Sequence, residues 1–279
     1  MKKGISIWSF PAQTLNESFS LAKKAGFEGV EVALDEKNGE ITLSSTEKDL
    51  LEIKKQANDN GIELYSVASG LYWSYFLNDD DEAQRSKAQD IVKKQLEVAS
   101  VLGCQTILVI PGCVNADFVA PGKVMDYERC YNRSLESVNK VKDYAKQYKV
   151  EIGLENVWNK FLLSPLEMRN FIDAVDSEWV GSYFDVGNTL YCGYPEHWIN
   201  ALGSRIKKVH FKDYRVQAGG LHGFVDLLAG DVNYPAVVEA LNGIGYDGWV
   251  TAEMIPAYKH YSETIIYNTS KAMDAILGR

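Results

Sequence analysis

The stretch Lys24-Ala25-Gly26-Phe27-Glu28-Gly29-Val30-Glu31 has the same construction as Ile244-Gly245-Tyr246-Asp247-Gly248-Trp249-Val250 near the other end of the chain. Each is the end of an amphipathic helix, followed by a glycine, an aromatic, an acid, a second glycine and an apolar strand. A glycine at such a helix end can take the left-handed conformation that terminates the helix. The same helix-to-strand connection at both ends of the chain indicates a repeated β–α unit.

Short apolar runs alternate with longer amphipathic stretches from one end of the chain to the other. The run Thr106-Ile107-Leu108-Val109-Ile110 is nearly all apolar, which is typical of a parallel strand buried on both faces. The predicted strands are residues 4–9, 29–34, 63–69, 106–111, 151–155, 180–185, 206–211 and 249–254. The predicted helices are residues 15–24, 45–60, 82–102, 127–148, 165–174, 196–202, 234–242 and 262–277.

Eight β–α units account for the whole chain of 279 residues, and no Pro-, Gly- or Ser-rich linker separates them. Right-handed crossovers between parallel strands leave two architectures, an open doubly wound sheet and a closed barrel. The count of eight favours the barrel, and the first strand lacks the Gly-x-Gly-x-x-Gly turn of dinucleotide-binding sheets. We therefore predict one α/β domain over residues 1–279, folded as a (β/α)₈ barrel of the TIM type.

The composition narrows the class of partner. The chain is 46% hydrophobic and carries 29 basic and 38 acidic residues, a net charge of −9 that disfavours binding along nucleic-acid phosphates. No apolar run approaches the ~20 residues of a membrane helix, and the N-terminus has no signal-peptide core. The four cysteines form no Cys-x-x-Cys pair, which predicts reduced thiols. We expect a cytoplasmic protein that binds a small molecule. The sequence leaves its oligomeric state open, with a homo-oligomer as one alternative.

Four consecutive predicted strands end in a potential metal ligand: Glu155, Asp185, His210 and Glu253. Active sites of such barrels lie at these strand ends. Any one of the four could be a solvated strand-end group, but three carboxylates meeting at one point need a cation to offset their repulsion. Oxygen and nitrogen donors without a thiolate favour Mn²⁺, Mg²⁺ or Co²⁺ over a structural Zn²⁺. We expect a divalent metal site, with Mn²⁺ first and Mg²⁺, Co²⁺ or Zn²⁺ as alternatives.

Five segments at and near these ligands carry a resemblance to a known family. They are Leu154-Glu155-Asn156, Phe184-Asp185-Val186-Gly187-Asn188, Val209-His210-Phe211-Lys212-Asp213, Gly230-Asp231-Val232-Asn233-Tyr234 and Ala252-Glu253-Met254. They resemble the xylose isomerase-like barrel superfamily of sugar isomerases and epimerases. The resemblance covers essentially the whole chain and is closest to the ketose and ketose-phosphate 3-epimerases. It implies that Glu155, Asp185, His210 and Glu253 hold a divalent metal, and that Glu155 and Glu253 are the catalytic acid/base pair.

The implied reaction explains the need for two carboxylates. A metal that binds a ketose carbonyl makes the neighbouring C–H acidic and stabilises the resulting enediolate. Inversion at C3 needs one carboxylate to remove the proton and a second on the opposite face to return one, whereas isomerisation can use one base. The alternatives are an aldose–ketose isomerase or an inosose-type dehydratase on the same scaffold, and a non-catalytic sugar-binding barrel. The chain has only four histidines and a net negative charge, and both disfavour a trinuclear-zinc nuclease of the endonuclease IV type.

Two departures from the free-ketose 3-epimerases bear on the substrate. Asn188 stands where those enzymes have a histidine, and Asn159-Lys160-Phe161-Leu162 replaces their Asn-Arg-Phe-Glu. The sequence is more similar to the sugar-phosphate branch, such as the L-xylulose 5-phosphate 3-epimerases. Lys212, Arg215 and the Gly219-Gly220 loop are the donors that could bind a phosphate, so we expect a preference for phosphorylated ketoses.

Several further residues are candidates for substrate binding, each with a plain structural alternative. Lys212 lies two residues after His210 and so on the same strand face, where it could bind substrate or pair with a carboxylate. Arg215 and His222 could contact the substrate or be solvated. Aromatic residues that follow strands one and three could line a sugar pocket or pack in the core: Trp8, Tyr72 and Trp73.

Overall fold

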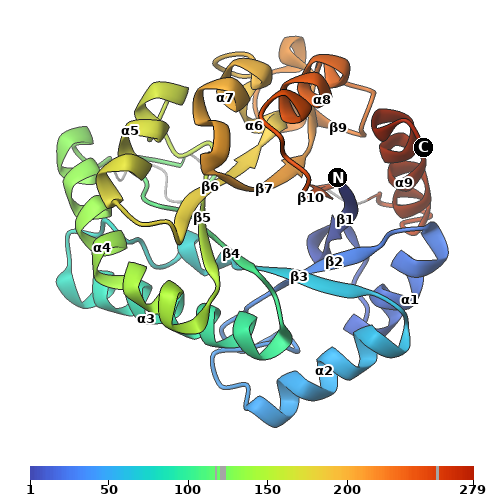
Figure 1. Ribbon diagram of the computed structural model, residues 1–279, viewed down its shortest axis with the longest axis horizontal. Coiled ribbons are helices and arrows are strands. Elements are labelled where there is room, and N and C mark those ends of the chain that lie inside the picture. Colours follow the sequence, from blue (N-terminus) through green and yellow to red (C-terminus); the bar gives the residue numbers. More distant parts are fainter. Residues whose placement is uncertain (117, 120–123, 256–257) are drawn as a thin grey trace.

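The computed structural model describes residues 1–116, 118–119, 124–255 and 258–279. Within these residues, eight parallel strands close into a barrel and helices surround it (Figure 1). Strand β1 pairs with β2 on one side and with β10 on the other, which closes the ring and confirms the predicted (β/α)₈ TIM barrel. The barrel strands are β1 (Lys2–Ser6), β2 (Gly29–Ala33), β3 (Glu63–Ala68), β4 (Thr106–Val109), β5 (Glu151–Glu155), β6 (Val180–Asp185), β7 (Ile206–Phe211) and β10 (Trp249–Ala252).

The helices follow the predicted amphipathic stretches closely. The end of the first helix has the predicted conformation, because Gly26 has a φ of 94°. Its start is fixed by Thr14 and Glu17, each of which accepts a backbone hydrogen bond from the other. No helix among the described residues is long and apolar enough to cross a bilayer. The helices are α1 (Leu15–Ala25), α2 (Glu47–Asp59), α3 (Glu82–Leu102), α4 (Tyr127–Tyr148), α5 (Pro165–Val175), α6 (Val186–Thr189), α7 (Pro195–Leu202), α8 (Tyr234–Gly243) and α9 (Thr264–Leu277).

The first strand is shorter at its C-terminal end than predicted. It ends at Ser6, and Ile7–Ser9 form a 3₁₀ turn in which the Phe10 N–H donates to the Ile7 carbonyl. The turn takes Trp8 out of the strand alternation. Its side chain then packs against Ala68, Leu108 and Tyr183 inside the barrel mouth.

A short antiparallel hairpin after β7 was not predicted from the sequence. It pairs β8 (Asp213–Tyr214) with β9 (Phe224–Val225). The buried Asp213 carboxylate organises the following loop, because its two oxygens accept hydrogen bonds from the backbone N–H groups of Tyr214, Leu228, Gly230 and Val232. The hairpin therefore holds Phe224 in a fixed position beside the ends of the barrel strands.

The barrel interior carries polar side chains among apolar ones. Tyr65 stacks on Trp249 with ring centroids 4.0 Å apart, and its hydroxyl lies 2.8 Å from Thr251 Oγ1. Higher in the barrel, Glu31 and Tyr183 are both fully buried. A carboxylate in such surroundings needs partners for both oxygens, and these partners belong to the site described next.

Candidate metal centre and active site

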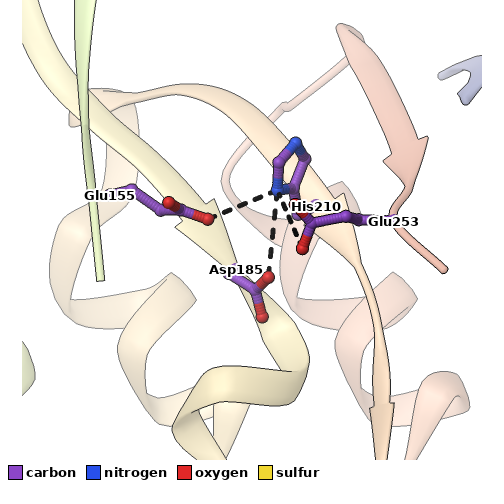
Figure 2. Close-up of side chains that lie close together, drawn as sticks. All are labelled: Glu155, Asp185, His210 and Glu253. Carbon is purple, nitrogen blue, oxygen red and sulfur yellow. Dashed lines mark ion pairs between the residues drawn. The ribbon is translucent and has the colours of Figure 1, made fainter. Parts of the chain in front are cut away.

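Four neighbouring strands bring the predicted metal ligands together (Figure 2). Glu155 ends β5, Asp185 ends β6, His210 is the penultimate residue of β7, and Glu253 directly follows β10. The register of β6 and β7 places Asp185 beside His210. The Glu253 N–H donates to the Phe211 carbonyl, which fixes the end of β10 against β7.

The ligand atoms surround one point. One atom from each of the four residues lies within 4.8 Å of all the others. His210 Nδ1 is 3.4 Å from Glu155 Oε1, 3.8 Å from Asp185 Oδ2 and 4.0 Å from Glu253 Oε2. Donors spaced in this way could all lie about 2.0–2.3 Å from one central cation.

Two buried atoms of the cluster indicate whether a divalent cation fits between the four side chains. Asp185 Oδ2 and His210 Nδ1 have no hydrogen-bond partner among the described residues, although both side chains are fully buried. Burying such atoms without partners is costly. Because both are metal-ligand atoms and face the same point as the two glutamates, a divalent cation there would satisfy them. The donor set of three carboxylates and one imidazole therefore fits a divalent metal.

The backbone around Asp185 is held by two asparagines. The Asn156 side chain both accepts from the Asp185 N–H at 2.9 Å and donates to the Asp185 carbonyl at 2.8 Å. The Asn188 N–H donates to Asp185 Oδ1 at 2.7 Å, and its side-chain amide donates to the Asn156 carbonyl. These contacts leave Asp185 Oδ2 directed at the ligand cluster.

The two glutamates differ in their electrostatic surroundings. Burial raises the pKa of Glu155 to about 7, with Asp185 and Glu253 acting in the same direction and His210 against it. Burial likewise raises the pKa of Asp185 to about 6. Burial also opposes the charge on Glu253, but the positive charges of Lys212 and His210 outweigh it and lower the pKa of that carboxyl. One glutamate is thus held ionised while the other readily takes up a proton.

Lys212 is the cause of this difference. Its Nζ lies 2.5 Å from Glu253 Oε2 and 4.0 Å from Asp185 Oδ2, and it also sits over the Phe224 ring at 4.7 Å from the centroid. Of the two roles considered for Lys212, the ion pair with a barrel carboxylate is present. The side chain also lines the cavity above the cluster.

A cavity of about 730 Å³ opens above the ligand cluster. Glu155, Lys212 and Glu253 lie in its lining together with many aromatic side chains. A mostly apolar lining with a few convergent polar groups is typical of a small-molecule site. The aromatic residues that line it are Trp8, Trp73, Phe118, Trp158 and Phe224.

The other predicted substrate contacts divide into two groups. Asn188 and the exposed His222 line the cavity. Arg215 does not line it, because its guanidinium is exposed and donates to the Ala229 carbonyl at 2.6 Å. Of the two roles considered for Tyr72, packing in the core is the one present, because its side chain is buried and its hydroxyl donates to Gln95 Oε1. Of the donors expected to bind a phosphate, Lys212 lines this cavity and Gly220 lines an adjoining one, whereas Arg215 lines neither.

Glu31 was not predicted from the sequence, and it contacts His210 on the side opposite the other three ligands. Its Oε1 lies 3.0 Å from His210 Nε2, and its Oε2 accepts a hydrogen bond from the Tyr183 hydroxyl. The available signal was an acid inside the apolar run Val30-Glu31-Val32, in the middle of a strand rather than at its end.

Comparison with known proteins identifies the family. The model of the xylose isomerase-like TIM barrel family matches residues 19–271, so the chain belongs to this family. A curated relative, the L-ribulose-5-phosphate 3-epimerase UlaE of Salmonella paratyphi A, is 23% identical over 94% of this chain and 89% of its own. A solved structure of D-psicose 3-epimerase in the presence of D-fructose has a TM-score of 0.81 at 20% identity and covers all of both chains. The IolI protein with a bound zinc atom has a TM-score of 0.82 at 18% identity, covering 100% of this chain and 98% of the other.

Proposed function

We propose that this member of the xylose isomerase-like TIM barrel family is a metal-dependent 3-epimerase of a small ketose. The observation that carries the proposal is the convergence of Glu155, Asp185, His210 and Glu253 at the floor of an aromatic-lined cavity. Strands β6 and β7 lie between β5 and β10 in the barrel order, so Glu155 and Glu253 approach the cluster from two sides (Figure 2). Two carboxylates on two sides suit inversion at one carbon.

The bound cation would polarise the ketose carbonyl and make the C3 proton more acidic. Glu253, which is paired with Lys212, would accept that proton. Glu155, from the other side of the cluster, would donate a proton to the opposite face of C3. In the reverse direction the two glutamates exchange these roles, as a reversible epimerisation requires.

The names of the similar proteins support this reaction class. The relative UlaE is a ketose-phosphate 3-epimerase, and the D-psicose enzyme is a ketose 3-epimerase. The zinc atom bound to IolI supports a divalent ion on this scaffold. For this chain we propose Mn²⁺, because oxygen donors dominate the ligand set.

The cavity favours a ketose without a phosphate. Among the described residues, the side chains of its lining that can carry a positive charge are Lys212 and His222, and Lys212 is already paired with Glu253. Arg215, one of the groups on which a phosphate preference rested, binds Ala229 instead. We therefore propose a neutral ketose as the substrate and a ketose phosphate as the alternative for comparison.

The test is proton exchange in deuterated water. Metal-stripped protein reloaded with Mn²⁺ is incubated with matched ketoses and ketose phosphates, and the quenched, metal-free sugars are analysed by NMR. An epimerase incorporates deuterium at C3 and forms the C3 epimer. Label at C1 or C2 would indicate an isomerase, loss of water a dehydratase, and no exchange with any sugar a binding protein. Faster turnover of the phosphate would overturn the neutral-ketose assignment alone.

The glutamate pair is tested by Glu155→Gln and Glu253→Gln. Each change keeps the shape but removes one proton transfer, so we expect epimerisation to fall by about 10²–10⁴-fold. Each variant should still exchange the C3 proton of one epimer, and the two variants should prefer opposite epimers. Metal content is measured in parallel, because glutamine is a weaker ligand. Full epimerisation by metal-loaded Glu155→Gln would show that the pair is wrongly assigned.

A further inference from the structure

The buried carboxylate of Glu31 has no place in the proton transfers above. It lies on β2, is fully buried, and reaches His210 from the side opposite the ligand cluster. We propose that Glu31 is a positioning residue, which sets the tautomer and orientation of His210 so that Nδ1 binds the cation. The inference rests on the proposed function only in requiring that a divalent cation binds the cluster.

The hydrogen bonds around Glu31 define which imidazole nitrogen carries the proton. A carboxylate oxygen accepts hydrogen bonds. Its Oε2 accepts from the Tyr183 hydroxyl, and its Oε1 lies 3.0 Å from His210 Nε2. In the proposed arrangement Nε2 is the N–H nitrogen, and in a neutral imidazole Nδ1 then holds the lone pair. Nδ1 is the atom that faces Glu155, Asp185 and Glu253.

The same residues restrict the rotation of the imidazole ring. The Tyr183 ring packs edge-on against His210, with centroids 4.7 Å apart and planes inclined by 64°. The Tyr183 hydroxyl also contacts Ser66 Oγ at 3.1 Å, which ties the phenol to β3. A ring held in this way presents Nδ1 to the cluster without an ordering cost when the cation binds. Carboxylates that support a metal-binding histidine typically contribute 10- to 100-fold to metal affinity.

A purely structural role for Glu31 predicts a different result. If Glu31 only neutralises His210 inside the barrel, replacing it would change the melting temperature of the metal-free protein and leave the affinity of the folded protein for metal unchanged. A positioning role predicts that affinity falls in variants that remain folded. Metal affinity therefore separates the two roles.

The first experiment measures Mn²⁺ affinity by competition titration on EDTA-stripped protein. Glu31→Gln keeps the size and one acceptor oxygen but loses the charge, and we expect its affinity to fall about 10-fold or more. Tyr183→Phe keeps the carboxylate on His210 and should lose less. Glu151→Gln is the matched control, because Glu151 is a β5 carboxylate that pairs with Lys207 and lies away from the cluster. Wild-type affinity in folded Glu31→Gln would overturn the inference.

The second experiment needs no variant. In protein loaded with diamagnetic Zn²⁺ and labelled with ¹⁵N-histidine, long-range ¹H–¹⁵N spectra report the tautomer of each of the four histidines. We expect His210 to be protonated at Nε2 and metal-bound at Nδ1, with an Nε2 proton protected from exchange. A proton on Nδ1, or metal at Nε2, would overturn the inference. Neither measurement uses a sugar, so a metal-loaded protein that fails to epimerise any ketose refutes the proposed function and leaves these results standing.

Discussion

At the scale of single residues, Lys212 decides which glutamate is ionised. Its Nζ contacts Glu253, whose pKa it lowers against the effect of burial, whereas burial raises the pKa of Glu155 to about 7 despite the neighbouring His210. Lys212→Met removes the positive charge and should raise the pKa of Glu253. Because an ionised Glu253 is the proposed base, the acidic limb of the kcat/KM profile should move to higher pH, and activity at pH 7 should fall about 10- to 100-fold.

The profile is measured on Mn²⁺-loaded protein, and Lys212→Arg provides the comparison that retains the charge. Metal affinity should not fall in Lys212→Met, because a positive charge near the cation has been removed. An unshifted acidic limb in Lys212→Met would show that another group controls Glu253.

Residue types at strand ends could be predicted, and contacts made inside the barrel could not. Glu155, Asp185, His210 and Glu253 were found because each stands where an apolar strand ends. Glu31 lies in mid-strand and its partner His210 is 179 residues away in the chain, so no local pattern connects them. The direction in which the Arg215 side chain points depends on the hairpin that carries it. The residue type alone does not predict that direction.

At the scale of elements, the hairpin of β8 and β9 depends on Asp213. Its carboxylate accepts four backbone hydrogen bonds and thereby fixes the loop that continues to Val232. Asp213→Asn replaces one accepting oxygen by an N–H₂ donor that faces backbone donors. We expect a local stability loss of about 2–3 kcal/mol, since hydrogen bonds to a charged group contribute about 1.5–3 kcal/mol each. Hydrogen exchange should become faster in the hairpin and its loop.

Asp231→Asn is the matched control, because among the described residues the exposed Asp231 carboxylate accepts one backbone hydrogen bond, from Val216. Asp213→Asn should raise KM, because Phe224 lines the cavity, while metal affinity stays close to wild type. Equal exchange rates in the two variants would contradict the assignment. The regular elements were predictable from hydrophobic periodicity, whereas this hairpin was not, because its strands are two residues long and their pairing depends on a buried carboxylate.

At the scale of the whole molecule, the barrel encloses more acid than it can keep ionised without a cation. The pKa values of Glu155 and Asp185 are raised, mainly by burial, to about 7 and about 6, from ordinary values of 4.5 and 3.8. At a pH between the ordinary and the raised pKa of each carboxyl group, the folded metal-free protein keeps a proton that the unfolded chain has released. The stability linked to those protons is therefore complete below about pH 4 and is lost as pH rises to about 7. The raised pKa of His210 acts in the same direction, since burial is outweighed by Glu31 and Glu253.

Metal-free protein should accordingly melt about 5 °C or more lower at pH 8 than at pH 5.5, since each kcal/mol corresponds to about 2–4 °C in a chain of this size. Excess Mn²⁺ should remove most of this difference, because the cation competes with the protons for the cluster and adds about 2.7 kcal/mol at 100 times its Kd. The lowered pKa of Glu253 has the opposite effect on stability, but this effect changes with pH only below about 4.5, outside the range of pH 5.5 to 8.

Differential scanning calorimetry at both pH values, with EDTA and with Mn²⁺, measures the linkage. Glu155→Gln is the informative variant, because glutamine is neutral at every pH and so imitates the protonated acid. Its metal-free melting temperature should vary less with pH than that of the wild type, and Mn²⁺ should stabilise it less. A metal-free wild type that melts at the same temperature at both pH values, with an equal Mn²⁺ shift at each, would mean that the cluster is not the site where protons and metal compete.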